Sequence, residues 1–423
     1  MIARALWSLA LRLALPLVFV RLWWRGRREP GYRLAWRERL GLGPASEPGA
    51  VWLHAVSLGE TRAAGALIDA LRALQPELRL LLTHGTATGR EAGRAWLRAG
   101  DRQCWLPYDT PGAVRRFLRR HRPRVGVLME TEVWPNLIVQ SVRRGVPMMM
   151  ANARLSARSA RKGRRLTALL RPAAEQLTLV LAQSHDDAVR IREAGARHVE
   201  VCGNLKFDMT PDPALVARGR DWRRALARPV VLMASSREGE ELPLLEAWRS
   251  QAVPRPLLLL VPRHPQRFDE VAAMVCAAGF NLARRSAWGD APAAVAADAD
   301  VWLGDSMSEM PLYYACADVA LLGGSFAPLG GQNLIEAAAC ACPVVMGPYT
   351  FNFEQAAVGA LAERAALRVA DLAQGVSRAI ELARDSRRAL WSQRALAFAD
   401  LHKGAARRMA ERIVQVMARG VAG

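Results

Sequence analysis

Lysine is nearly missing from this chain of 423 residues, although the chain is strongly basic. Its 59 basic side chains, all but three of them arginine, outweigh 39 acidic ones and leave a formal net charge of +20. Arginine binds phosphate and carboxylate groups bidentately, so the excess suits anionic partners, although codon bias in a GC-rich genome would also produce it. No nucleic-acid module is recognisable, and the aromatic residues, at 6%, do not alternate with basic ones. We therefore expect an anionic membrane surface or an anionic substrate, and no nucleic acid.

Cysteine is also scarce, and its six occurrences form no Cys-x-x-Cys pair. This favours reduced, buried thiols in a cytosolic protein. No His/Cys cluster has metal-ligand spacing, and neither a Walker phosphate loop nor a Gly-x-Ser-x-Gly motif occurs. The sequence therefore predicts no metal site, no P-loop NTPase and no hydrolase of the nucleophile-elbow type.

Long apolar runs are absent except near the N-terminus, where residues 5–24 are apolar and end in two tryptophans. Arg12 and Pro16 interrupt this run, which makes it marginal for the ~20 apolar residues of a spanning helix. Residues 1–45 contain nine Arg and two Glu, and no small-residue cleavage site is present. We interpret residues 1–30 as a membrane anchor with its basic flank on the cytoplasmic side. The alternative is an amphipathic helix packed on the protein's own core.

From residue 50 onward, short apolar runs alternate with helical patterns in two successive series. This alternation predicts an α/β protein with two Rossmann-like, doubly wound domains that face a central cleft. The proline-rich segment 209–213 marks the break between the series. The predicted parts are the anchor at 1–30, an N-terminal domain at 31–209, a C-terminal domain at 210–400, and a C-terminal helix at 401–423 that packs back across the cleft.

The segment 319–353 carries the most informative pattern, because a short apolar run is followed by two glycine pairs and then by a helical pattern. Backbone N–H groups of such a loop, with a helix N-terminus, suit a phosphate. Glu336, one turn into the helix that Asn333 opens, could accept hydrogen bonds from ribose hydroxyls. The segment therefore predicts a nucleotide site; the alternative is that the glycines only permit turns.

In the N-terminal half, acidic residues follow two predicted strands. Glu60 could be a general base for a hydroxyl acceptor, but Ser57 and Glu60 equally match a helix capping box. Glu130, Glu132 and Trp134 suggest a ligand rich in hydroxyl groups. Alternatively, Glu132 caps the next helix and Trp134 packs in the interface.

Basic and small polar residues follow other predicted strands. Arg154 and Arg158 open a basic stretch that could bind lipid phosphate or could simply be a solvated face. In the C-terminal half, candidate anion or donor contacts follow three strands: Ser236 and Arg237, Arg263 and His264, and Met307, Ser308 and Glu309.

Taken in order, these segments identify a family. The chain resembles the 3-deoxy-D-manno-octulosonic acid (Kdo) transferases of lipopolysaccharide assembly, which are GT-B glycosyltransferases. The similarity rests on HAVSLGETRAA, LPYDTP, METEVWPNL, ANARLSARS, GNLKFD, VPRHPQRF, GDSMSEM and GGSFAPLGGQNLIEAAACACPVVMGPYTFNF. Gln332 and Leu334 depart from the family's usual Gly-Gly-His-Asn-Pro-Leu-Glu pattern.

The resemblance implies an inverting transfer of Kdo from CMP-Kdo to lipid A precursor (lipid IVA), without a metal or cofactor, at the cytoplasmic face of the inner membrane. It implies that Glu60 is the catalytic base. The donor residues that it implies are Arg263, His264, Met307, Ser308, Glu309, Gly330, Gly331, Gln332, Asn333, Leu334, Ile335 and Glu336. Contacts to the Kdo carboxylate or the transition state are expected from Glu130, Lys206, Ser236 and Arg237, and acceptor contacts from Arg154 and Arg158.

Other functions would keep some of these residues. A UDP-sugar transferase or a nucleotide-sugar epimerase would need the glycine loop and Glu336, although an epimerase would not need the anchor. A non-catalytic membrane scaffold of the same ancestry would keep the anchor and would not need Glu60.

Overall fold

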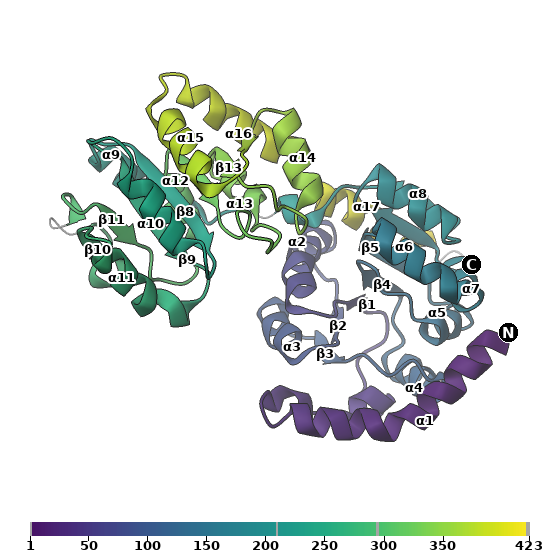
Figure 1. Ribbon diagram of the computed structural model, residues 1–423. Coiled ribbons are helices and arrows are strands. Elements are labelled where there is room, and N and C mark those ends of the chain that lie inside the picture. Colours follow the sequence, from purple (N-terminus) through teal and green to yellow (C-terminus); the bar gives the residue numbers. More distant parts are fainter. Residues whose placement is uncertain (1, 209, 293–295, 420–423) are drawn as a thin grey trace. The chain divides into compact units, whose positions relative to one another are not determined.

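In a computed structural model of the chain, residues 2–208, 210–292 and 296–419 are described, and the chain divides into two compact units (Figure 1). The first unit runs to Asp208 and also includes the chain from Lys403 onward. The second unit is the part between them, which ends at His402. The chain therefore passes from one unit to the other twice.

Within the described residues, the first unit holds a parallel sheet of seven strands in the order β3-β2-β1-β4-β5-β6-β7. The strands are β1 (Val51–His54), β2 (Leu80–His84), β3 (Arg102–Trp105), β4 (Val125–Met129), β5 (Met148–Ala153), β6 (Leu179–Ala182) and β7 (Val199–Val201). The helices are α1 (Ile2–Arg25), α2 (Leu58–Leu74), α3 (Ala87–Gly93), α4 (Pro111–His121), α5 (Pro135–Val142), α6 (Ala157–Gly163), α7 (Thr167–Ala174), α8 (His185–Glu193) and α17 (Ala405–Arg419). Short 3-10 turns are η1 (Pro30–Arg33), η2 (Trp36–Leu40), η3 (Arg94–Trp96), η4 (Arg164–Leu166) and η5 (Leu205–Asp208).

Helices cover both faces of this sheet, which is why its central strands are apolar along their whole length. In β1, Val51 and Leu53 face the cluster made with α2 and α17, whereas Trp52 faces the cluster made with α4, α5 and α8. Side chains of successive strand residues point to opposite faces, so both clusters draw on the same strands. The chain winds outward from β1 in one direction and then from β4 in the other, so the carboxyl ends of β1 and β4 flank the switch point of the sheet.

The described part of the second unit repeats this plan in a seven-stranded parallel sheet of order β10-β11-β9-β8-β12-β13-β14. Its strands are β8 (Val230–Ser236), β9 (Leu257–Pro262), β10 (Leu282–Arg284), β11 (Val301–Leu303), β12 (Val319–Leu322), β13 (Val344–Met346) and β14 (Ala366–Arg368). Its helices are α9 (Pro213–Ala225), α10 (Glu241–Arg249), α11 (Phe268–Ala277), α12 (Met310–Cys316), α13 (Leu334–Ala339), α14 (Glu354–Ala362), α15 (Leu372–Arg384) and α16 (Arg388–His402), with turns η6 (Pro265–Arg267) and η7 (Arg285–Ala287). The switch point of this sheet lies between β8 and β12.

The C-terminal segment is divided between the two units. α16 lies in the second unit and contacts α13, whereas α17 lies in the first unit and packs against α2. Asp208 accepts hydrogen bonds from the backbone N–H groups of Gly404 and Ala406 and thereby caps the start of α17. The predicted segment 401–423 thus corresponds mainly to a helix that completes the core of the first unit.

α1 is a long helix at the edge of the first unit (Figure 1), and by length and composition it could cross a membrane. Polar contacts fix it to the unit near its start, because the Trp7 indole donates to Asp109 at 2.9 Å and the Ser8 hydroxyl lies 3.3 Å from the Asn136 side-chain oxygen. Further along, Phe19 packs against the ring of Trp36. One side of α1 is thus attached to the protein.

Candidate functional site

Glu60 lies in the first turn of α2, directly after β1, and its carboxylate is held in place by its own turn. The carboxylate accepts hydrogen bonds from the Val56 backbone N–H at 2.8 Å and from the Ser57 hydroxyl at 3.0 Å, while Ser57 caps the helix. The helix-cap interpretation is therefore confirmed. It does not exclude a base, because burial raises the pKa of this half-buried carboxyl against the effect of these hydrogen bonds.

Two further carboxylates share this edge of the sheet. Glu130 and Glu132 follow β4, which pairs with β1, and Glu130 adopts a left-handed backbone with φ of 58°. Burial, followed by the charge of Glu60, raises the pKa of Glu132 to about 7. Glu130 also raises the pKa of Glu60. Carboxyl groups whose pKa values are raised by burial and by neighbouring carboxylates are typical of sites that move protons.

Lys206 and Arg154 belong to the same electrostatic group. Burial lowers the pKa of Lys206, Glu130 opposes this shift, and Arg154 adds to it. Arg154 follows β5, the next strand after β4 in the sheet, and Lys206 lies in η5. Arg158 lies on α6, and both arginine side chains are exposed. The sheet thus gathers Glu60, Glu130, Lys206 and Arg154 at one edge.

The expected helix-cap role of Glu132 is wrong. The residue before α5 is Trp134, which makes no side-chain cap. Instead, Asp109 accepts from the backbone N–H groups of Asn136 at 3.2 Å and Leu137 at 2.7 Å. The Asp109 carboxylate, from a loop distant in sequence, therefore accepts from the N-terminal N–H groups of α5 in place of Glu132.

In the second unit, the glycine loop follows β12 at the switch point of the sheet. Gly324, Gly330 and Gly331 all have positive φ, and Ser235 at the end of neighbouring β8 has a φ of 56°. A side chain at Gly323 would collide with the backbone of Ser235, since its Cβ would lie 2.3 Å from a carbonyl oxygen. The glycines therefore allow two strand-end loops to approach each other closely.

The first glycine pair, Gly323–Gly324, already contacts a negatively charged group of the protein, the carboxylate of Glu240. This side chain is 2% exposed and accepts hydrogen bonds from the backbone N–H groups of Gly324 at 2.8 Å and Arg237 at 2.9 Å, with a longer one from Phe326 at 3.3 Å. The Gly331 N–H donates to the Gly324 carbonyl. The expectation that the whole loop offers free N–H groups to a phosphate is therefore wrong for Gly324 and Gly331.

The second half of the loop leads into α13 as predicted, with Asn333 as the cap that accepts from the Ile335 N–H at 3.1 Å. α13 has only six residues, so its dipole is a minor source of anion binding. Burial raises the pKa of Glu336 in this helix, and the charge of Arg263 partly opposes the shift. Arg263 and Glu336, predicted as donor contacts from distant parts of the sequence, therefore lie within electrostatic reach of each other.

The remaining predicted residues of this edge are arranged around β8, β9 and α13. The Arg263 N–H donates to the Ser236 carbonyl, and the Ser236 hydroxyl donates to Glu241 at 2.8 Å. Arg237 follows β8, and His264 precedes η6. Gly330 and Gln332 lie in the loop, and Leu334 and Ile335 are buried in the first turn of α13.

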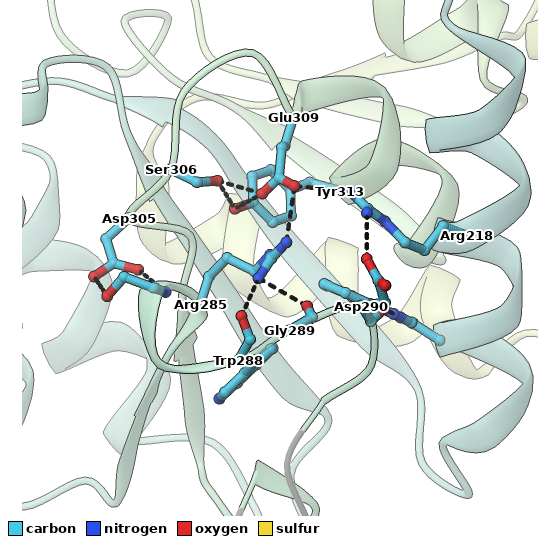
Figure 2. Close-up of polar contacts among 11 residues, drawn as sticks. Arg218, Arg285, Trp288, Gly289, Asp290, Asp305, Ser306, Glu309 and Tyr313 are labelled. Carbon is cyan, nitrogen blue, oxygen red and sulfur yellow. Dashed lines mark hydrogen bonds and ion pairs between the residues drawn. The ribbon is translucent and has the colours of Figure 1, made fainter.

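Glu309 is held by a network that the sequence did not predict (Figure 2). Its carboxylate accepts from Arg218 at 2.8 Å, Arg285 at 2.9 Å and the Ser306 hydroxyl at 2.6 Å. Burial acts to raise the pKa of Glu309, but the Ser306 and Arg285 contacts and the charge of Arg218 lower it overall. Arg285 also donates to the carbonyl of Trp288 at 2.9 Å. The Glu309 side chain thus stabilises the loop between β11 and α12.

The exposed part of this loop is the preceding pair, Met307 and Ser308. Met307 is 59% exposed, and Ser308 has a φ of 66°. Strained backbone at a strand-end loop is a common feature of binding sites. Among the described residues no group of three or more His, Cys, Asp or Glu side chains is arranged to hold a metal ion, and the expected absence of a metal stays a prediction.

Comparisons with known proteins agree on one family. A family model described as 3-deoxy-D-manno-octulosonic-acid transferase (kdotransferase) matches residues 34–209. The 3-deoxy-D-manno-octulosonic acid transferase of Bordetella pertussis is 49% identical over 421 residues, which cover 96% of this chain and 97% of the relative. That of Haemophilus influenzae is 36% identical over 364 residues, 84% of each chain.

Solved structures support the fold. HepE from Anabaena, solved with UDP, superposes with a TM-score of 0.54 at 16% identity, covering 88% of this chain and 100% of that one. A glycosyltransferase from Rickettsia africae gives a TM-score of 0.57 at 11% identity, covering 89% of this chain and 99% of that one. The predicted GT-B class with two parallel α/β units is confirmed.

Proposed function

The chain belongs to the Kdo transferase family of glycosyltransferases, and from this premise we propose that it transfers Kdo from CMP-Kdo to a lipid A precursor, lipid IVA. The family assignment rests on 49% identity to the Bordetella pertussis transferase over 96% of the chain. The observation that supports the chemistry is a half-buried carboxylate, Glu60, at the carboxyl edge of the first sheet with a raised pKa.

In the proposed mechanism, Glu60 removes the proton from the primary hydroxyl of the acceptor. The oxygen attacks the anomeric carbon of Kdo while the bond from that carbon to the phosphate oxygen breaks, so the configuration inverts and CMP leaves. The Val56 N–H and the Ser57 hydroxyl hold the Glu60 carboxylate in orientation before the reaction. Glu60 afterwards releases its proton to solvent.

The donor is proposed to bind in the second unit without a metal or cofactor. Glu336 would accept hydrogen bonds from the ribose, and Arg263, within electrostatic reach of it, would meet the negative charge of the leaving CMP. His264, Met307 and Ser308 would complete the CMP contacts, and Gly330 to Ile335 would shape the loop. Because the N–H groups of Gly324 and Gly331 are bonded to Glu240 and to the Gly324 carbonyl, we propose that the phosphate lies against the backbone at Gly330.

Kdo carries a carboxylate of its own, and we assign it to cationic and polar groups at the strand ends. Lys206 and Arg237 are the candidate cations, with Ser236 as a neutral donor. Lys206 also interacts with Glu130, which would hold it in position for the reaction. The exposed Arg154 and Arg158 would bind a phosphate of the acceptor.

We propose that α1 attaches the protein to the cytoplasmic face of the inner membrane and lies along the bilayer surface. Its exposed large apolar residues recur every three or four positions and form one stripe: Ile2, Leu6, Leu9, Leu13, Leu17, Val20 and Trp24. The opposite side is fixed to the first unit through Trp7 and Ser8. A helix with one apolar side and one attached side suits an interfacial position better than a span.

Mass spectrometry of the product tests the function. Purified full-length protein, CMP-Kdo and lipid IVA should give the acceptor plus Kdo, and Glu60→Gln protein should give at most a trace. A parallel reaction with UDP-sugars should give no product. Transfer from a UDP-sugar but not from CMP-Kdo would reject the proposed donor.

A further inference from the structure

A cavity of about 400 Å³ lies where α1 meets the first unit, outside the residues assigned to catalysis. Its walls include Arg4, Ser8, Leu9 and Arg12 from α1 and Asn136 and Gln140 from α5. Arg4, Ser8 and Arg12 are spaced four residues apart and so share one side of the helix. The cavity therefore places two guanidinium groups beside a residue of the exposed apolar stripe, Leu9.

A second, smaller cavity of about 200 Å³ adjoins the same arginine. Arg4 and Arg143 line it together with apolar residues of α5 and α7, including Val139 and Leu169. Three arginines thus border two neighbouring cavities at the side of α1.

These three arginines, Arg4, Arg12 and Arg143, form no ion pair with any carboxylate of the described residues. In the described ranges, the one carboxylate that bears on Arg4, Asp109, accepts hydrogen bonds from Trp7 and from backbone N–H groups. Arg4 and Arg143 repel each other instead. Guanidinium groups that line a cavity without an ion-pair partner leave hydrogen-bond donors and positive charge available to an anion.

We propose that the cavity between α1 and α5 binds the phosphate headgroup of an anionic phospholipid. The argument rests on the proposed membrane position of α1, and charge complementarity identifies the headgroup. Leu9 belongs to the apolar stripe, so an acyl chain attached to the bound phosphate would run directly onto the surface that faces the bilayer. Inorganic phosphate would leave these apolar contacts unused. The bound lipid would fix the rotation of α1 about its axis and hence the orientation of the first unit on the membrane.

A soluble lipid tests this site without a membrane. Full-length protein is titrated calorimetrically with monomeric dihexanoyl phosphatidylglycerol, below the concentration at which that lipid forms micelles. We expect one saturable site, at least tenfold weaker binding in the double variant Arg4→Gln with Arg12→Gln, and little change in the control Arg21→Gln with Arg28→Gln. The control removes the same charge from arginines of the same region that do not line the cavity.

Three results would overturn the proposal. The first is equal affinity of both double variants for dihexanoyl phosphatidylglycerol, and the second is equally tight binding of dihexanoyl phosphatidylcholine or inorganic phosphate to the wild type. The third is an increased acceptor KM of the Arg4→Gln, Arg12→Gln variant in phospholipid-free detergent while its phosphatidylglycerol binding is unchanged. That result would assign the cavity to the acceptor. Thermal unfolding of each variant shows whether α1 remains attached. Product formation from CMP-Kdo, measured in the wild type, reports the transferase function separately, so failure of one proposal is distinguishable from failure of the other.

Discussion

The Glu240 carboxylate accepts two hydrogen bonds from the backbone N–H of Gly324, at 2.9 and 2.8 Å, and so joins the loop after β8 to the glycine loop after β12. The carboxylate does inside the protein what a bound phosphate would do, since it neutralises the N–H groups of a tight glycine turn. The loop is thereby shaped before the donor arrives.

Replacing Glu240 by Gln should weaken CMP binding by tenfold or more. The amide has lost the charge, and its NH2 group would face N–H donors if it took the place of one oxygen. Calorimetric titration of CMP measures the effect, with Glu238→Gln as the matched control because Glu238 is exposed two residues away. Equal CMP affinity in both variants would mean that the hydrogen bonds between Glu240 and Gly324 have no influence on the donor site.

Glu60→Gln should lower kcat by at least ~10²-fold and change CMP affinity little, because a base acts on the acceptor and not on the nucleotide. In the wild type, burial raises the pKa of Glu60, so activity should fall on acidification at a pH above 4.5, the ordinary value. Steady-state rates across pH measure both effects. Near-normal turnover of the Gln variant would leave Glu60 with its capping role alone.

Glu132 should make the fold less stable as pH rises. Its pKa in the folded chain is about 7 against an ordinary 4.5, so between these values the folded state binds more protons than the unfolded state. The free energy of unfolding therefore falls across this interval. Glu132→Gln should remove that decline, and be more stable than the wild type at pH 8 but not at pH 4. Denaturant titrations at both pH values check this, and parallel curves would contradict the assignment.

Glu309→Gln should destabilise the second unit by about 1.5–3 kcal/mol at neutral pH, because Arg285 would lose this acid partner and Arg218 would keep only the exposed Asp290. The pKa of Glu309 is lowered, so its stabilising effect is present above the ordinary pKa of 4.5 and is lost as pH falls through the folded value. The difference between variant and wild type should therefore shrink in acid. Arg218→Lys should lose less than Glu309→Gln, since a cation remains.

Ile413→Ala should destabilise the first unit by about 3 kcal/mol, the usual cost of removing a buried aliphatic side chain. Ile413 lies on α17 in the core cluster of α2 and is fully buried. Hydrogen exchange should accelerate in α2 and leave the second unit unchanged. Gln415→Ala, an exposed position on the same helix, is the control.

The sequence predicted the central strands correctly but missed β3, β10 and β14. All three lie at sheet edges, and they read Arg-Gln-Cys-Trp, Leu-Ala-Arg and Ala-Leu-Arg. Short edge strands have polar residues where central strands are apolar, so they lack the continuous hydrophobic run by which buried strands are recognised.

The sequence also brought the correct loops to attention without showing what their side chains contact. Glu240 and Glu309 lie in strand-end loops, where a ligand could reach them, yet each is bound by groups of the protein itself. Gly324, which binds Glu240, is 84 residues away, and Arg218 and Arg285, which bind Glu309, are 91 and 24 residues away. Such partners depend on how strands are ordered in the sheet, which single-sequence patterns do not determine. The electrostatic influence of Arg263 on Glu336 cannot be read from the sequence for the same reason.

The return of α17 to the first unit has a consequence for folding during translation. During synthesis, the first unit's sheet and α2 leave the ribosome long before residues 405–419 do. The sheet face that α2 and α17 cover together therefore remains only partly covered until α17 is made. The second unit, continuous in sequence from residue 209 to residue 402, has no such wait. The N-terminal half of the chain should therefore finish folding last, after translation ends, although α1 is synthesised first.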